Sequence, residues 1–208
     1  MGRGILSATV LAGMAALALA AAAATGAAPA QPHVTVLGDS VLTAVQWNDA
    51  PLATLQKGFD MYMDVGVCRT VAGISCPYEG GRVPTLMDVI AGMGNRLGPL
   101  VLVEVGYNDD PTRYRPDLDI VMRALVRYRV RTVIWLTLRE ADTKHAPENR
   151  VIEAAPRRWP QLVIADWNAY SADHADWFLE DGIHPTPLGA ANLGVFIHTV
   201  LARAVGSR

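Results

Sequence analysis

The sequence has few cysteines and no excess of charge of either sign. Only 2 cysteines occur among 208 residues, and 18 lysines and arginines nearly balance 20 aspartates and glutamates. The arginines are scattered, apart from Arg127, Arg129 and Arg131, which lie where a helix is expected to end and where cations complement the helix dipole. Because there is no basic patch, the composition argues against a nucleic-acid partner.

Long apolar runs are also missing, except at the N-terminus, and no later run is predicted to cross a membrane. Arg3 precedes an alanine-dominated segment from Ile5 to about Ala24, and Ala28-Pro29-Ala30 then provides the small residues of a cleavage site. We predict a secretory signal peptide over 1–30 and one mature domain over 31–208. An uncleaved membrane anchor is the alternative, although alanine is a weak membrane residue.

Export gives the two cysteines a simple interpretation. Cys68 and Cys76 are close in sequence, and an even pair in an exported chain is typical of a disulfide that closes a small loop. No other cysteine or histidine lies nearby in sequence, which argues against a metal site. We therefore expect a disulfide in a secreted or cell-envelope protein, with no stable membrane insertion once the signal peptide is removed.

Short apolar runs alternate with longer segments of helical spacing along the mature chain. This alternation predicts a parallel sheet with helices on both faces, a flavodoxin-like three-layer α/β/α sandwich with five strands. The predicted strands cover about 33–37, 61–67, 99–105, 131–138 and 161–165. The predicted helices cover about 41–57, 82–97, 115–130, 146–158 and 187–205.

Polar residues follow several of these strands. Ser40 comes after the first, Gly80-Gly81 lies in the connection after the second, Asn108 follows the third, and His184 lies after the fifth. Because ligands of open parallel α/β sheets bind outside the carboxyl ends of the strands, these residues are predicted to meet along one edge.

Three short blocks carry a family resemblance that spans essentially the whole mature chain. In order along the chain, they are Gly38-Asp39-Ser40, Gly106-Tyr107-Asn108-Asp109 and Asp181-Gly182-Ile183-His184-Pro185. Each block alone is a weak signal, but together they resemble the SGNH hydrolases, also called GDSL esterases and lipases. No Gly-x-Ser-x-Gly surrounds Ser40, so the nucleophile elbow of the α/β-hydrolases is not predicted.

The resemblance implies a catalytic triad of Ser40, His184 and Asp181. A serine hydroxyl needs a base to become a nucleophile, and a histidine can take its proton while an aspartate orients the ring. Simpler interpretations exist for each residue. Ser40 could cap the helix that follows it, and His184 and Asp181 could be ordinary turn residues.

The same resemblance implies three donors to an oxyanion, namely the Asn108 side chain and the backbone N–H groups of Ser40 and Gly81. Asn108 could instead satisfy the turn in which it lies. Gly81 is assigned because Gly81-Arg82-Val83-Pro84-Thr85-Leu86 resembles the second block of the family, although the loop closed by cysteines and the adjacent glycines depart from the usual pattern. Gly80 or Gly73 could serve in its place.

The expected activity is hydrolysis of carboxylic esters by an exported enzyme, with short-chain acyl or acetylated sugar esters as substrates. The resemblance implies no metal and no organic cofactor. Two alternatives are an O-acyltransferase that passes an acetyl group to or from cell-envelope glycans and a non-catalytic binding module. The sequence does not specify the oligomeric state.

Other polar residues receive structural interpretations. Glu104 is expected at the sheet end or paired with an arginine, and Asp109-Asp110 and the stretch from Asp173 to Asp176 are expected to be solvated surface. His145 is also expected at the surface. Trp47 and Trp177-Phe178 lie close enough in sequence to the catalytic blocks to line a pocket.

Overall fold

The computed structural model describes residue 1 and residues 30–141 and 143–206, so the predicted signal peptide lies almost entirely outside the described residues. Residues 31–206 contain one five-stranded parallel sheet with the order β2-β1-β5-β6-β7. These strands are β1 (His33–Gly38), β2 (Asp60–Val65), β5 (Leu100–Glu104), β6 (Thr132–Leu136) and β7 (Leu162–Ala165). The predicted flavodoxin-like sheet is confirmed.

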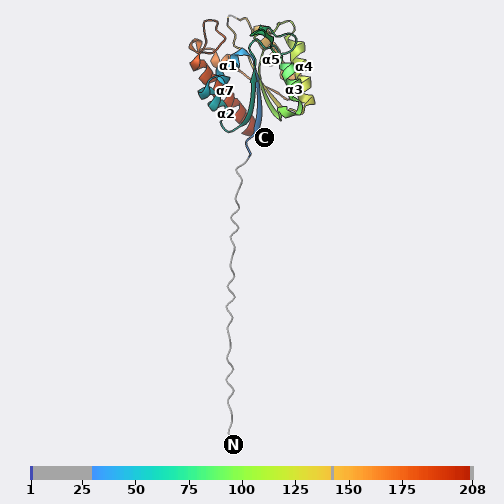
Figure 1. The fold of residues 1–208 in the computed structure, drawn as a ribbon, viewed down its shortest axis with the longest axis vertical. Coiled ribbons are helices and arrows are strands. Elements are labelled where there is room, and N and C mark those ends of the chain that lie inside the picture. The colour runs from blue at the N-terminus through green and yellow to red at the C-terminus, as the bar shows by residue number, and fades with distance from the viewer. Residues whose placement is uncertain (2–29, 142, 207–208) are drawn as a thin grey trace. The chain divides into compact units, whose positions relative to one another are not determined.

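Helices cover both faces of the sheet (Figure 1). One face packs against α1 (Ser40–Gln46), α2 (Asp49–Gln56) and α7 (Pro187–Gly206), and the other against α3 (Leu86–Met93), α4 (Tyr114–Arg127) and α5 (Ala146–Ala154). The central strand β5 is buried at all five positions, which explains its almost continuous apolar sequence. Burial of apolar surface on both faces is the main force that holds the three layers together.

The predicted helix over 41–57 is wrong as a single element. The structure divides it into α1 and α2, with a break at Trp47 and Asn48. Pro51 lies in the first turn of α2, where a backbone N–H has no partner within the helix, so its absence costs no hydrogen bond. Inside a continuous helix, Pro51 would remove a hydrogen bond and clash with the preceding turn. The predicted helix over 82–97 also starts later, because Thr85 and Asp88 form a reciprocal capping box that fixes its first turn.

The structure adds small elements that the sequence pattern did not predict. A hairpin of β3 (Pro77–Tyr78) and β4 (Gly81–Arg82) precedes α3, and α6 (Trp167–Ser171) follows β7. Three 3₁₀ turns complete the described elements: η1 (Gly94–Leu97) and η2 (Ala155–Arg157) form the last residues of the helices predicted over 82–97 and 146–158, and η3 (Ala175–Trp177) lies outside the predicted helices. These segments are only two to five residues long, too short for a hydrophobic period to reveal them.

Helix α7 has the length and composition of a membrane-spanning helix, which corrects the expectation that no run after the N-terminus does. In the structure it instead lies against the sheet. Leu193, Ile197 and Leu201 are fully buried in the same core as the β1 side chains, and Gly194 lies directly against the Pro51 carbonyl. This packing explains the apolar residues on the buried face of α7, while Leu188 and Val195 are exposed.

Candidate active site

Ser40 is presented by the sharp transition from β1 to α1. The N-cap of α1 is Asp39, whose side chain accepts a hydrogen bond from the Val41 N–H. Ser40 is therefore the first helical residue and does not cap the helix, so the simpler interpretation of this serine is wrong. Its hydroxyl lies 2.9 Å from Nε2 of His184, 144 residues later in the chain.

His184 and Asp181 lie in one tight turn before α7. Nδ1 of His184 is 2.7 Å from Oδ2 of Asp181, while the other carboxylate oxygen accepts the backbone N–H groups of Ile183 and His184. The turn is closed at its base by the bond from the Leu179 N–H to the His184 carbonyl. Gly182 adopts φ +71°, a left-handed conformation that glycine accepts without steric cost.

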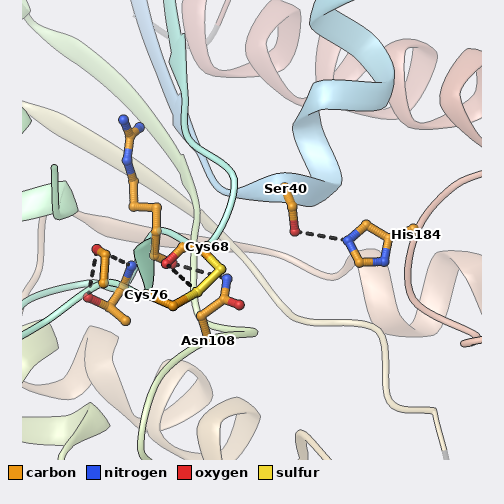
Figure 2. The surroundings of a disulfide bond; sticks show 8 residues. Ser40, Cys68, Cys76, Asn108 and His184 are labelled. Carbon is orange, nitrogen blue, oxygen red and sulfur yellow. Dashed lines mark hydrogen bonds between the residues drawn. A yellow bond between two sulfur atoms is a disulfide. The ribbon is translucent and has the colours of Figure 1, made fainter. Parts of the chain in front are cut away.

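The three side chains thus form a continuous hydrogen-bonded series (Figure 2 shows the Ser40 and His184 part). An ionised carboxylate can only accept, so the Asp181 bond places the ring proton on Nδ1 and leaves the Nε2 lone pair toward Ser40. Burial raises the pKa of Asp181, but the bonds from Ile183 and His184 outweigh it and hold that pKa below its ordinary value. This arrangement suits proton transfer from a hydroxyl to an imidazole.

Asp39 is a buried carboxylate that organises the floor of the site. Besides Val41, it accepts the backbone N–H groups of Gly106 and Tyr107, which lie just after β5. Burial raises the pKa of Asp39 to about 6, and these three bonds act in the opposite direction. Asp39 lies just after β1 and its carboxylate bonds to the segment just after β5. It therefore links the segment that carries Ser40 to the segment that carries Asn108.

Glu104 is the last residue of β5 and is fully buried, as the sheet-end interpretation requires. Among the described residues no arginine is hydrogen-bonded to it, so the arginine pairing is not found. Burial raises its pKa well above the ordinary value, and the nearby charge of Asp39 adds to the effect. Glu104 therefore favours its neutral form.

Asn108 lies beside the disulfide-closed loop, as Figure 2 shows. The structure contains the predicted disulfide between Cys68 and Cys76. Nδ2 of Asn108 donates to the backbone carbonyl of Arg69, at 3.2 Å, next to the first of these cysteines. The side chain thus contacts this loop as well as belonging to the segment after β5.

Gly81 lies in β4, on an exposed part of the β3–β4 hairpin. Gly80 and Gly73 are also exposed, and both have positive φ angles. Among the described residues, no hydrogen bond joins any of these three glycines to Ser40, Asn108 or His184. Their assignment to the oxyanion stays a prediction.

Two residues near the site were interpreted incorrectly as surface residues. Both carboxylate oxygens of Asp109 accept the Val71 N–H, and burial, reinforced by the charge of Asp39, raises the pKa of Asp109 to about 7. His145 is 3% exposed, its ring meets Tyr107 edge to face, and burial lowers its pKa to about 4. No sequence pattern indicated either position, because both contacts join segments 38 residues apart.

The aromatic residues that were expected to line a pocket near the site differ in exposure. Trp47 is 64% exposed, whereas Trp177 and Phe178 are each 7% exposed and pack against Trp167. Trp177 and Phe178 also join the segment just after His184, through the bond from the Thr186 N–H to the Trp177 carbonyl and the bridge between Phe178 and Pro185. Among the described residues, no group of three or more histidine, cysteine, aspartate or glutamate side chains is placed to hold a metal ion.

No protein-family model matches the sequence, and no curated protein sequence matches it significantly. Solved structures do match. The psychrotrophic esterase EstA from Pseudoalteromonas sp., inhibited by monoethylphosphonate, gives a TM-score of 0.61 at 14% identity, covering 84% of this chain and 98% of that one. A carbohydrate esterase of family 3 from Talaromyces cellulolyticus gives 0.53 at 19% identity, covering 85% and 99%. The fold is that of the SGNH-type esterases.

A third similar structure is an acetyl esterase variant with a bound acetate ion, at a TM-score of 0.54 and 17% identity, covering 85% of this chain and 99% of that one. Each of these three chains is covered almost completely, so the likeness extends over the whole domain. The SGNH-type fold brings the carboxyl ends of β1 and β5, and the turn before α7, to one edge of the sheet, where the Ser40–His184 bond forms.

Proposed function

We propose that this chain is an exported serine esterase of the SGNH family that hydrolyses carboxylic esters through an acyl-serine intermediate. The observation that carries the proposal is the hydrogen-bonded series from the Ser40 hydroxyl through His184 to Asp181. An aspartate, a histidine and a serine bonded in this order are the parts of a nucleophilic acyl-transfer site.

In the first half-reaction, Ser40 Oγ attacks the ester carbonyl carbon while Nε2 of His184 takes the hydroxyl proton. The carbonyl π electrons move to oxygen, which gives a tetrahedral oxyanion. Collapse of this intermediate breaks the bond to the alcohol, and His184 returns its proton to the leaving oxygen. Asp181 stabilises the imidazolium that exists between these steps.

In the second half-reaction, water attacks the acyl-serine. His184 takes a proton from the water, and collapse of the second tetrahedral intermediate releases the carboxylic acid and returns the proton to Ser40. No redox step is needed, and water is the co-reactant that balances the reaction. A sugar hydroxyl in place of water would make the enzyme an acyltransferase by the same chemistry.

The proposed donors to the oxyanion are the Asn108 amide, the Ser40 N–H and the Gly81 N–H. The Ser40 N–H lies in the first turn of α1, where backbone donors have no acceptor within a helix. Asn108 has two amide hydrogens, of which Arg69 uses one. A donor of this kind typically contributes about 3 to 4 kcal/mol to transition-state stabilisation. For Gly81 the support is the sequence resemblance alone.

The proposed substrates are short-chain acyl esters or acetylated sugars. Similar structures include an acetyl esterase and a carbohydrate esterase of family 3, which supports small acyl groups. The predicted signal peptide and the disulfide support export, because disulfides persist in oxidising compartments.

The test compares purified wild-type protein with S40A on p-nitrophenyl acetate, butyrate and octanoate, with and without a sugar acceptor. We expect hydrolysis by the wild type and none above background by S40A, with unchanged unfolding of the variant. A fluorophosphonate probe should label Ser40 in the wild type. Ser171→Ala is the matched control, because in the part of the chain that the structure describes that hydroxyl bonds only carbonyls of its own helix, those of Trp167 and Asn168.

Full activity of S40A would overturn the proposal. Preferential transfer of the acyl group to the sugar would assign the transferase alternative. A wild-type protein that neither hydrolyses esters nor reacts with the probe would indicate a binding module.

A further inference from the structure

Arg69 is an almost completely buried arginine in the loop between β2 and α3. Its side chain is 3% exposed and forms an ion pair of 2.6 Å with Asp64, the only charged group bonded to it among the described residues. Burying a charge costs folding free energy unless its donors find acceptors. A buried arginine therefore indicates that the planar guanidinium group forms a specific set of hydrogen bonds.

The guanidinium joins the ends of three segments. Its nitrogens donate to the carbonyl of Gly38 at the end of β1, to the carbonyl of Asp64 near the end of β2, and to the carbonyl of Pro84 before α3, at 3.1, 3.0 and 3.1 Å. Gly38 is two residues before Ser40. The rigid, planar fork thus fixes the loop of Arg69 relative to the strand that presents the proposed nucleophile.

Gly66 leaves the space that this side chain occupies. A Cβ atom at position 66 would lie 2.9 to 3.0 Å from the guanidinium, closer than real Cβ contacts allow. Gly66 and Arg69 are also joined by a backbone hydrogen bond. The segment from Gly66 to Arg69 therefore forms a tight turn, and the guanidinium of Arg69 lies against Gly66.

The backbone of the same residue contacts the proposed oxyanion donor. The Arg69 carbonyl accepts one hydrogen of the Asn108 amide, and this bond selects one orientation of a side chain that could otherwise rotate. The second amide hydrogen on the same nitrogen is directed elsewhere by the planar geometry of the amide. Asp109 fixes the loop from the other side through the Val71 N–H.

We propose that Arg69 is a positioning residue for ester hydrolysis, whose buried guanidinium holds its own carbonyl where it aims the Asn108 amide at the oxyanion. This inference rests on the proposed function. It assigns Arg69 a role in transition-state stabilisation, with no contact to the substrate.

The first experiment compares Arg69→Met and Arg69→Lys with the wild type. Both variants keep an aliphatic stem but lose the fork, so we expect kcat to fall about 10- to 100-fold with little change in KM. Arg158→Met is the control, because Arg158 is another arginine in an ion pair, with a side chain 27% exposed, and it pairs with Asp119 of α4, outside the elements that carry the site. It should lose stability and keep its kcat.

The second experiment is a double-mutant cycle. N108A should lower kcat about 10²- to 10³-fold, and adding Arg69→Met should lower it by less than about 3-fold more, because the residue that Arg69 positions is already gone. Independent effects would instead multiply. All rates are compared at a temperature where each variant is folded, as judged by circular dichroism.

The third experiment disturbs Arg69 without removing it. Gly66→Ala should displace the guanidinium and lower kcat in the same direction as Arg69→Met. Gly92→Ala is its control, because a Cβ at Gly92 meets nothing within 4 Å and an alanine suits α3.

A wild-type kcat in folded Arg69→Met, an equal kcat loss in Arg158→Met, or multiplicative effects in the cycle would each overturn the inference. An inactive wild type would overturn the proposed function and this inference with it, whereas an active wild type with an unaffected Arg69→Met overturns the inference alone.

Discussion

The candidate site has a sheet side, which includes Asp39 and Arg69, and a turn side, which includes Asp181 and His184. The two sides differ in burial and in how far apart in the sequence their hydrogen-bond partners lie. On the sheet side, Asp39 is fully buried and Arg69 is 3% exposed, and their bonds join β1, β2 and the segment after β5. On the turn side, the side chains of His184 and Asp181 are 42% and 47% exposed, and within the described part of the chain Asp181 bonds only to residues two and three positions away.

This difference separates stability from chemistry. The sheet side consists of buried polar groups, whose loss leaves partners unsatisfied and costs folding free energy. The turn side is bonded mainly within itself, so its side chains can change with less effect on the rest of the domain. Substitutions on the two sides should therefore have different signatures.

His184→Ala gives the largest expected effect, and it separates the loss of activity from the loss of stability most clearly. Loss of the base should lower kcat at least about 10³-fold, while the exposed position should leave the melting temperature nearly unchanged. Steady-state kinetics and thermal unfolding on the same sample measure both. A large drop in melting temperature would show that the turn supports the fold, and the contrast between the sides would fail.

Asp109→Asn tests the sheet side through its pH dependence. The pKa of Asp109 is raised to about 7 from an ordinary 3.8, so the folded wild type binds this proton more tightly than the unfolded chain does. The wild type should therefore lose stability from this group as pH rises from about 4 to about 7, by up to about 4 kcal/mol, whereas asparagine does not ionise.

The difference in unfolding free energy between D109N and the wild type should thus move in favour of the variant over that range in urea titrations. Asp110→Asn is the control with the opposite sign, because bonds from the Thr112 hydroxyl and N–H lower the pKa of Asp110. A D109N difference that does not vary with pH would show that Asp109 ionises normally in the folded protein.

Removal of the disulfide has an intermediate expected effect. In C68A/C76A, the loss of a cross-link over 8 residues should lower the unfolding free energy by about 2 to 3 kcal/mol, chiefly because the unfolded chain gains entropy. Because the loop contacts Asn108, kcat should fall as well. Denaturant unfolding and kinetics measure the two effects, and unchanged kcat would show that the remaining loop bonds suffice to position Asn108.

Gly182→Ala should have the smallest effect of the four. Alanine is strained at φ +71°, and its Cβ would lie 2.9 Å from that of Ala141, so we expect a loss of about 1 to 2 kcal/mol. Since the turn carries both Asp181 and His184, kcat should fall together with stability. An unchanged kcat would mean that the turn adjusts around position 182 without moving His184.

The sequence predicted the sheet because five apolar runs were each long enough to show a pattern. Each predicted strand overlaps an observed one, including the buried β5. The division between α1 and α2 could have been anticipated from Pro51, whose position inside a long helix is unfavourable. The β3–β4 hairpin and α6 could not, because each is too short for a period to emerge.

The sequence by itself determined the order of the strands and helices and the proposed chemical groups, Ser40, Asn108, Asp181 and His184, because local patterns and short blocks encode them. Only the tertiary structure decided that Asp39 joins two strand ends, that the buried Arg69 side chain is bonded to the end of β1 and that Asp109 is partly buried and bonded to the Val71 N–H. The physical reason is that each of these bonds joins a side chain to a backbone group up to 68 residues away. Any residue supplies such a carbonyl or N–H, so no side-chain pattern in the sequence marks where the partner lies.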